Sequence, residues 1–238
     1  MDLREEASGV VPARHWYYRS KARVLRSLIE DRVSDSAVVW DVGAGSGFFA
    51  AYLLANDLAG SAVCIDPNYD SEYDVSVKKR ALAYRHRPSG IAPDLVTLMD
   101  VLEHVEDPIG LLTEYAERAR PGATFFITVP AHQWLWSDHD VFLGHYRRYT
   151  RALLTQTALD SGLIVDHCGY FFASILPAVW AVRARRRSDP ELVAASDMKR
   201  SNPVVGALLE AVLGAERRLF GINALAGVSV VLVAHSPE

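Results

Sequence analysis

Hydrophobic and polar residues form two kinds of block that alternate along the chain. Nearly continuous short apolar runs are typical of buried strands, and apolar residues at steps of three or four are typical of helices that face a core. The short runs predict strands at 36–42, 60–65, 80–85, 93–100, 123–129, 163–172 and 227–234. The longer spacing predicts helices at 13–32, 47–57, 108–118, 150–159, 174–187 and 203–220. This alternation predicts a largely parallel sheet with helices on both faces.

The first predicted helix is amphipathic. Its apolar stripe consists of Tyr18, Ala22, Leu25 and Ile29. We expect this stripe to pack on the sheet. The aromatic run from Trp16 to Tyr18 either packs there as well or walls a ligand pocket, where an aromatic face attracts a cation.

The last predicted helix, 203–220, is apolar over a wide arc, and several arginines between 183 and 187 precede it. Such a helix is a lid, the seam of a homodimer, or a surface that touches a membrane. The arginines would suit lipid headgroups or a phosphorylated substrate, although such a run is more often a solvated face. We favour a lid or dimer element over peripheral membrane contact.

Composition places the chain among globular enzymes. It has 238 residues, half of them hydrophobic, and a net charge of −4, which argues against a dedicated nucleic-acid partner. Cys64 and Cys168 both lie in apolar runs and are expected to be reduced core residues. The acidic first residues do not read as a signal peptide, and no apolar stretch is long enough for a transmembrane segment. We therefore expect a cytoplasmic protein.

A glycine-rich turn follows the first predicted strand. The strand ends in Asp41, and Gly43, Gly45 and Gly47 follow at alternate positions before a helix pattern begins. Glycines at such a turn allow a ligand to approach the backbone, and the helix start offers N–H groups. The spacing differs from the dinucleotide fingerprint, and the Asp41 carboxylate would repel a pyrophosphate. It would attract a ligand that carries an ammonium and a sulfonium.

A second acidic residue ends the next predicted strand. Asp66 lies far enough beyond Asp41 for a helix between the two strands, so both strand ends should meet at one edge of the sheet. There Asp66 could accept both hydroxyls of a ribose. Alternatively, it is a turn residue, because Asp66, Pro67 and Asn68 form a good turn sequence.

The turn and three later motifs resemble the class I methyltransferases that use S-adenosylmethionine (SAM). The likeness is to small-molecule methylases of the ubiquinone and menaquinone type, also described as methyltransferase type 11/12-like. The three later motifs are the Asp-Val-Leu-Glu-His run at 100–104, the Pro-Gly turn and strand at 119–130, and the histidine-bearing helix entry at 144–150. Together the four motifs cover about 36–172, and their agreement in order favours membership of this superfamily.

The resemblance implies a doubly wound, Rossmann-like α/β fold. Its sheet would have seven strands, mostly parallel, with an antiparallel final strand. The chain would be a single domain, 1–238, built from an N-terminal helical cap (1–35), a core (36–172), a C-terminal helical insertion or lid (173–227) and the last strand (228–238).

The resemblance also implies SAM as cofactor and S-adenosylhomocysteine as its product. The expected cofactor-binding residues are Asp41, Gly43, Ala44, Gly45, Gly47, Asp66, Pro67, Asp100 and Val101. One departure concerns adenine, because many relatives carry an acidic residue after the third strand. Here that region, 84–90, has none, so backbone groups or residues near 85–87 would contact the adenine.

Two histidines are the candidate catalytic residues. Removing a proton from a hydroxyl acceptor requires a base. His104 and His145 are expected to act as this base or to orient the substrate. Alternatively, Glu103 and His104 organise the turn and His145 fixes its loop by a hydrogen bond. The expected substrate-binding residues are Trp16, Tyr17, Trp134, Trp136, His139 and Tyr146. No metal is expected, because no tight ligand pair on one helix face is present.

We therefore expect methyl transfer from SAM to a small-molecule acceptor, with a hydroxyl favoured over nitrogen or carbon. A role in bacterial secondary-metabolite or glycolipid biosynthesis would fit. The alternatives are a SAM-binding enzyme with cyclase-type chemistry and a non-catalytic SAM-binding partner subunit.

Overall fold

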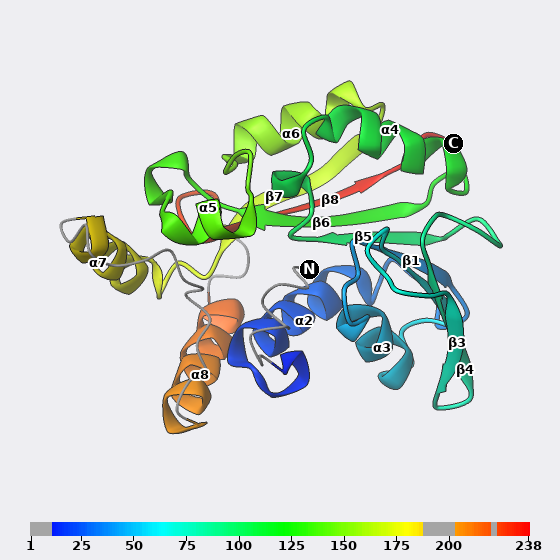
Figure 1. Cartoon of the computed structure of the whole chain (residues 1–238), viewed down its shortest axis with the longest axis horizontal. Coiled ribbons are helices and arrows are strands. Elements are labelled where there is room, and N and C mark those ends of the chain that lie inside the picture. Colours follow the sequence, from blue (N-terminus) through cyan, green and yellow to red (C-terminus); the bar gives the residue numbers. More distant parts are fainter. Residues whose placement is uncertain (1–10, 188–202, 220–222) are drawn as a thin grey trace.

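A single eight-stranded sheet organises the chain (Figure 1). The computed structural model describes residues 11–187, 203–219 and 223–238. The strand order is β3-β4-β2-β1-β5-β6-β8-β7. Neighbours from β4 to β6 are parallel, whereas β8 is antiparallel to both β6 and β7. The strands are β1 (Val38–Val42), β2 (Ser61–Ile65), β3 (Tyr73–Val77), β4 (Arg80–Arg85), β5 (Leu95–Met99), β6 (Thr124–Pro130), β7 (Ile164–Phe171) and β8 (Ser229–His235).

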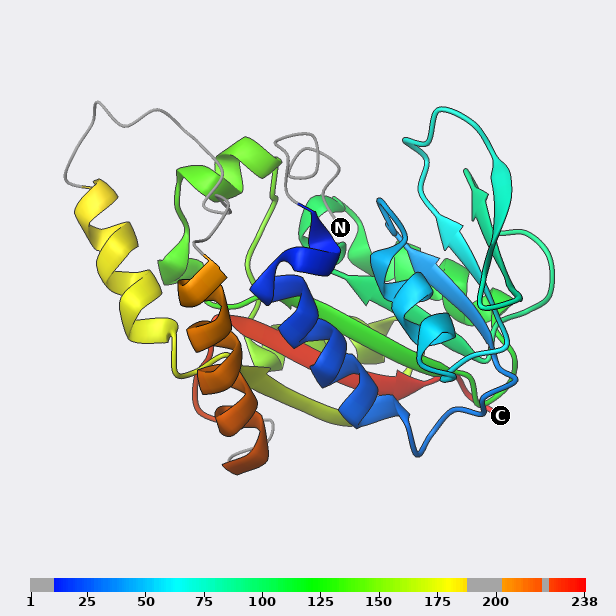
Figure 2. The same cartoon turned by 90° about the horizontal axis from the view of Figure 1, so that it is seen from below.

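Helices cover both faces of this sheet, as predicted. Figure 1 shows α4 (Pro108–Arg118) and α6 (Arg151–Asp160) on one face, and Figure 2 shows α2 (Trp16–Ile29), α3 (Phe48–Ala55) and α8 (Pro203–Leu219) on the other. Beyond one end of the sheet lie α5 (Asp138–Leu143) and α7 (Leu176–Arg187). The 3-10 helices are η1 (Pro12–Arg14), η2 (Leu102–His104) and η3 (Gln133–Leu135).

The predicted count of seven strands is wrong by one. The extra strand, β3, forms an antiparallel hairpin with β4 at the edge of the sheet. Its residues are mostly exposed, so they lack the apolar run that reveals a buried strand. The turn is made by Lys78 and Lys79 at φ +48° and +69°, where a hairpin usually has asparagine or glycine. The sequence around this hairpin therefore carries no ordinary turn signal.

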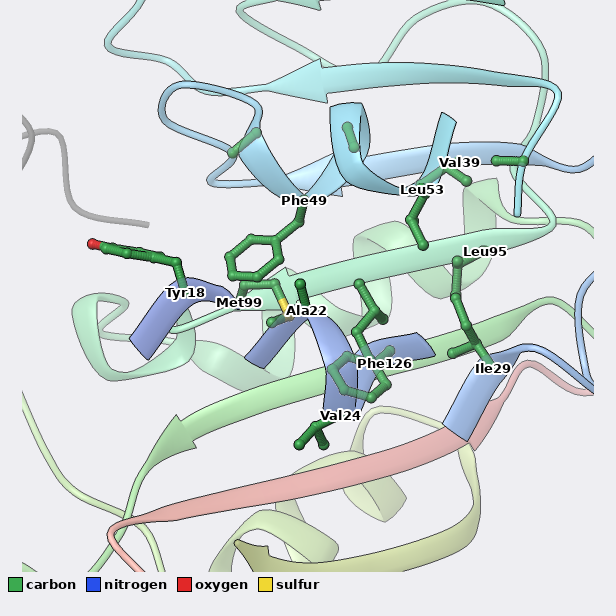
Figure 3. Packing of buried hydrophobic residues seen from close by; sticks show 14 of the residues in the cluster. Tyr18, Ala22, Val24, Ile29, Val39, Phe49, Leu53, Leu95, Met99 and Phe126 are labelled. Carbon is green, nitrogen blue, oxygen red and sulfur yellow. The ribbon is translucent and has the colours of Figure 1, made fainter. Parts of the chain in front are cut away.

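The predicted stripe of α2 is confirmed as the centre of one core layer. Tyr18, Ala22, Leu25 and Ile29 are all buried between α2 and the sheet. Figure 3 shows Ala22 of this stripe between Phe49 of α3 and Phe126 of β6. A second buried cluster fills the other face beneath α4 and α6. The two layers fix the carboxyl ends of β1, β2 and β5, where ligands bind in open parallel sheets.

The predicted cap, insertion and single-domain division remain predictions. Residues 1–10, 188–202 and 220–222 of those segments lie outside the described residues. α8 is joined to α2 by ion pairs from Arg19 and Arg23 to Glu210. It leaves Val204 and Leu208 exposed. Within the described residues, no helix combines the length and apolar character that crossing a membrane requires.

Candidate functional site

The glycine turn, residues 43–47, has a backbone that other residues would strain. Gly43, Gly45 and Gly47 have φ of +62°, +53° and +73°. A Cβ on Gly43 would lie 2.8 Å from Cγ2 of Val101, and a Cβ on Gly47 would lie 2.6 Å from the Tyr84 hydroxyl. These glycines therefore fit the turn closely against β4 and the segment after β5.

Asp41 supports this turn from behind. Its buried carboxylate accepts hydrogen bonds from Thr97 Oγ1 (2.7 Å) and from the backbone N–H of Ala50 (3.2 Å). These bonds tie β1 to β5 and to the first turn of α3. Burial raises the pKa of Asp41 to about 6.

Asp41→Asn should raise the free energy of unfolding near pH 7.5 and leave it almost unchanged near pH 4. The folded pKa of about 6 lies above the ordinary 3.8, so the stability that the protonated form contributes is lost as the pH rises through 6. Two pKa units correspond to about 3 kcal/mol. Urea unfolding of both proteins should show a difference that grows toward that value with pH. A difference independent of pH would contradict the buried charge.

Asp66 lies at the carboxyl end of β2 beside the glycine turn. Its carboxylate accepts hydrogen bonds from the backbone N–H groups of Gly45 (3.2 Å) and Asn68 (3.0 Å). The second of these is the turn contact expected from the Asp66-Pro67-Asn68 sequence. Asp66 also lines a cavity, so the same carboxylate can organise the turn and face a ligand.

This cavity, here called the glycine-turn cavity, has a volume of about 920 Å³. Of the expected cofactor-binding residues, its wall includes Gly43, Asp66, Pro67, Asp100 and Val101. The other four, Asp41, Ala44, Gly45 and Gly47, are buried and do not line it. The loop after β4 contributes His86, Arg87 and Pro88, the region where the sequence left adenine recognition open.

Asp100 closes the cavity from the end of β5. Its φ is +56°, and its carboxylate accepts hydrogen bonds from Lys21 Nζ, Tyr17 Oη (3.2 Å) and Thr128 Oγ1 (3.3 Å). Burial acts to raise the pKa of Asp100, but the adjacent Lys21 ammonium outweighs it and the pKa is lowered. Lys21 is only 1% exposed. It was missed in the sequence, although it lies four residues from both Tyr17 and Leu25, on the helix face that packs inward.

A second cavity of about 230 Å³, here called the histidine cavity, adjoins the first. Of the expected substrate and catalytic residues, Trp16, Tyr17, His104, His139 and His145 line it. The other expected substrate residues do not line either cavity: Trp134 is 49% exposed and stacks on His132, Tyr146 is 56% exposed, and Trp136 is half-buried. The loop 130–149 thus divides between a cavity wall and an outer surface.

His145 is held by a buried carboxylate. Its Nδ1 lies 2.8 Å from Oδ1 of Asp140, which is fully buried and also accepts two bonds from Arg148 at 2.7 and 3.1 Å. Burial acts to raise the pKa of Asp140, but His145 and Arg148 more than offset this and hold it well below its usual range. The ring of His145 stands edge-on to that of His104, with centroids 4.6 Å apart. The expected loop-fixing bond is therefore present and also orients the ring.

Glu103 is the functional candidate that the sequence suggested only as a turn residue. It is 1% exposed and lines the histidine cavity, and its Oε2 has no hydrogen-bond partner. Burial, together with the nearby Asp100 charge, raises its pKa well above the ordinary value. Its backbone carbonyl also accepts a 2.7 Å bond from the N–H of Tyr146. Both suggested roles, turn and site, are thus compatible with its position.

The two cavities share part of their walls. Asp100, His104 and Leu143 line both. A group bound in the glycine-turn cavity and another bound in the histidine cavity would therefore meet beside His104. This arrangement suits transfer of a small group between two ligands.

Comparison with known proteins agrees with this geometry. Residues 13–171 match the family described as methyltransferase domain. Ubiquinone biosynthesis O-methyltransferases from Xanthomonas campestris and Hahella chejuensis are 32% and 30% identical over 103 and 99 residues. Those matches cover 39% and 38% of this chain, and the chain spans about two fifths (42%) of the length of these relatives.

Solved structures share the fold. A methyltransferase in complex with a methyltransferase activator from Haloferax volcanii superposes with a TM-score of 0.59 at 19% identity, covering 95% of this chain and 92% of that one. A phosphoethanolamine N-methyltransferase from Haemonchus contortus in complex with SAM has a TM-score of 0.56 at 14% identity, covering 91% and 52%. The family match covers two thirds of the sequence, so the predicted methyltransferase family is confirmed. The chain belongs to the methyltransferase domain family.

Proposed function

We propose that this enzyme transfers a methyl group from SAM to a hydroxyl of a small molecule. The observation that carries the proposal is the shared wall of Asp100, His104 and Leu143 between two cavities of different character. The larger cavity would hold SAM, with its methyl group directed toward that wall. The smaller one would hold the acceptor.

The glycine-turn cavity suits SAM by its chemistry. Asp66 would accept the ribose hydroxyls, and the ammonium of the methionine end would lie toward the half-buried Asp100 carboxylate, with the buried Asp41 carboxylate behind the cavity wall. His86, Arg87 and Pro88 would enclose the adenine in place of the acidic residue found in many relatives.

Asp66→Asn should weaken binding of S-adenosylhomocysteine by about 10- to 100-fold, because a bond to a charged group contributes roughly 1.5–3 kcal/mol. The asparagine oxygen can still accept from Gly45, although the bond from the Asn68 N–H to the second carboxylate oxygen is lost. Calorimetry with Asp70→Asn, a nearby exposed carboxylate, provides the matched control. Unchanged affinity in Asp66→Asn would remove Asp66 from the ribose site.

The histidine cavity favours a hydroxyl acceptor. Its wall combines the aromatic rings of Trp16 and Tyr17 with Glu103, His104 and His145, which can take up or displace a proton. A hydroxyl must lose a proton during methylation, so such a cluster has a use there. The naming of the relatives as O-methyltransferases supports the same choice. A biosynthetic role, residence in the cytoplasm and homodimer formation stay predictions.

The proposal is tested by incubating the protein with SAM and paired phenols and anilines of matched shape. We expect S-adenosylhomocysteine to form with the phenols and the product to carry an O-methyl group by NMR. Exclusive N-methylation would contradict the hydroxyl acceptor. SAM binding without formation of S-adenosylhomocysteine for any acceptor class would favour the cyclase-type or non-catalytic alternative.

A further inference from the structure

Three potential metal ligands converge in the wall of the histidine cavity. One ligand atom from each of Glu103, His104 and His145 lies within 4.8 Å of the others. Glu103 and His104 come from η2 after β5, and His145 comes from the segment after α5. The fold therefore brings together residues about forty positions apart in the sequence.

We propose that Glu103, His104 and His145 bind a divalent transition-metal ion, Zn²⁺ foremost, which takes the acceptor hydroxyl as a further ligand. Binding of the ion is independent of the proposed function, whereas its catalytic use rests on it. The sequence analysis predicts no metal because it finds no ligand pair on one helix face. The ligands of this cluster come from two separate segments of the chain instead.

The charges around the cluster leave room for a cation. Asp100 is paired with Lys21, and Asp140 is paired with Arg148. Among the described residues, Glu103 has no ion-pair partner, and its Oε2 accepts no hydrogen bond although it is buried. A buried carboxylate in this state is costly unless a proton or a cation accompanies it. A divalent ion would satisfy Glu103 and leave the two existing pairs undisturbed.

The bond between His145 and Asp140 has the arrangement that orients metal-binding histidines. Nδ1 of His145 faces the Asp140 carboxylate at 2.8 Å, so Nε2 is the nitrogen left to bind an ion. A carboxylate on the far nitrogen fixes the ring and makes the near nitrogen more basic. Because Asp140 is fully buried and held by Arg148, the His145 ring is already oriented before any ion arrives.

The spacing fits an ion after a small contraction. Atoms within 4.8 Å of one another lie at most about 2.8 Å from a common centre, and zinc bonds to histidine and carboxylate are about 2.0–2.2 Å. Each ligand atom would have to move by less than about 1 Å toward the centre, which a side-chain rotation can provide. Two imidazoles and one carboxylate favour zinc or a neighbouring transition metal over Mg²⁺, which prefers oxygen ligands. Three protein ligands also leave a position open for a substrate oxygen.

The ion would act as a Lewis acid without a change in oxidation state. Coordination lowers the pKa of a bound hydroxyl, whose proton passes to water. The resulting oxygen then attacks the methyl carbon, so that the O–C bond forms while the S–C bond of SAM breaks. The electron pair of that bond stays on sulfur, and neutral S-adenosylhomocysteine leaves. In this form His104 and His145 hold the ion rather than accept the proton.

The 238-residue chain, freed of metal by dialysis against a chelator, would be titrated with Zn²⁺ by calorimetry and with Co²⁺ by visible absorption. We expect one site per chain and Co²⁺ bands typical of nitrogen ligation. Glu103→Gln and His145→Ala should each weaken binding at least 100-fold, and Asp140→Asn by 10- to 100-fold. His235→Ala, which removes a half-buried histidine paired with Asp166, should bind as wild type does.

Absence of Zn²⁺ and Co²⁺ binding by the metal-free protein would overturn the proposal, and so would binding that survives in folded Glu103→Gln and His145→Ala. Circular dichroism establishes that the variants are folded. Calorimetry with S-adenosylhomocysteine separates this result from the proposed function. Retained nucleoside binding without metal binding rejects the ion alone, whereas metal binding without nucleoside binding rejects the methyl-transfer assignment alone.

Discussion

His145→Ala is expected to lower kcat for methyl transfer by about 10²- to 10⁴-fold, the range for loss of a group that handles the reacting proton. The ring lies against His104 and is oriented by Asp140, so its removal leaves the acceptor hydroxyl without its positioned partner. Affinity for S-adenosylhomocysteine should change little, because His145 lines only the histidine cavity. Single-turnover rates and calorimetry on the same preparation measure both quantities.

The matched control for this variant is His235→Ala, which should keep wild-type turnover because it lies at the far end of β8. A kcat within threefold of wild type in His145→Ala would remove His145 from the chemistry. Treatment with a chelator separates the two ways in which His145 can act. A proton-accepting histidine would work unchanged without metal, whereas a metal ligand would lose its function together with the ion.

Most of the fold can be predicted from the sequence because buried strands and helices leave regular patterns of apolar residues along the chain. The central strands are buried on both faces, and α4 begins at Pro108 and ends at Arg118 as predicted. Thr150 also caps α6, since its side chain accepts a bond from the N–H of Leu153. The edge strand β3 escaped because an exposed strand needs no apolar run, and its lysine turn has no distinctive residue.

The candidate site was less predictable, because position along the chain does not show which way a side chain faces. Asp41 and Asp66 both end strands in the sequence, yet only Asp66 lines the glycine-turn cavity while Asp41 is directed into the sheet. Trp134 is an aromatic residue of the kind that often lines pockets, but it stacks on His132 outside both cavities. The burial of Glu103 and the partners of Lys21 are set by tertiary packing, which a single sequence does not display.

Gly47→Ala is expected to destabilise the fold by about 3 kcal/mol or more, and Gly122→Ala by only about 1–2 kcal/mol. The two glycines have nearly the same φ, +73° and +72°, so alanine meets the same backbone strain at both. Their surroundings differ. A Cβ at Gly47 would lie 2.6 Å from the Tyr84 hydroxyl and 2.8 Å from Cys64 Sγ, whereas at Gly122 nothing lies within 4 Å.

The difference between these variants therefore measures how closely the turn fits against β2 and β4, apart from the backbone conformation. Urea unfolding monitored by circular dichroism gives both values. Adding Tyr84→Phe to Gly47→Ala removes the nearer contact and should restore part of the lost unfolding free energy. The effect of Tyr84→Phe alone must be subtracted, because the Tyr84 hydroxyl donates a hydrogen bond to the Ser46 carbonyl. Equal destabilisation at Gly47 and Gly122 would show that the turn yields without cost, and close packing would then no longer explain why glycine occupies position 47.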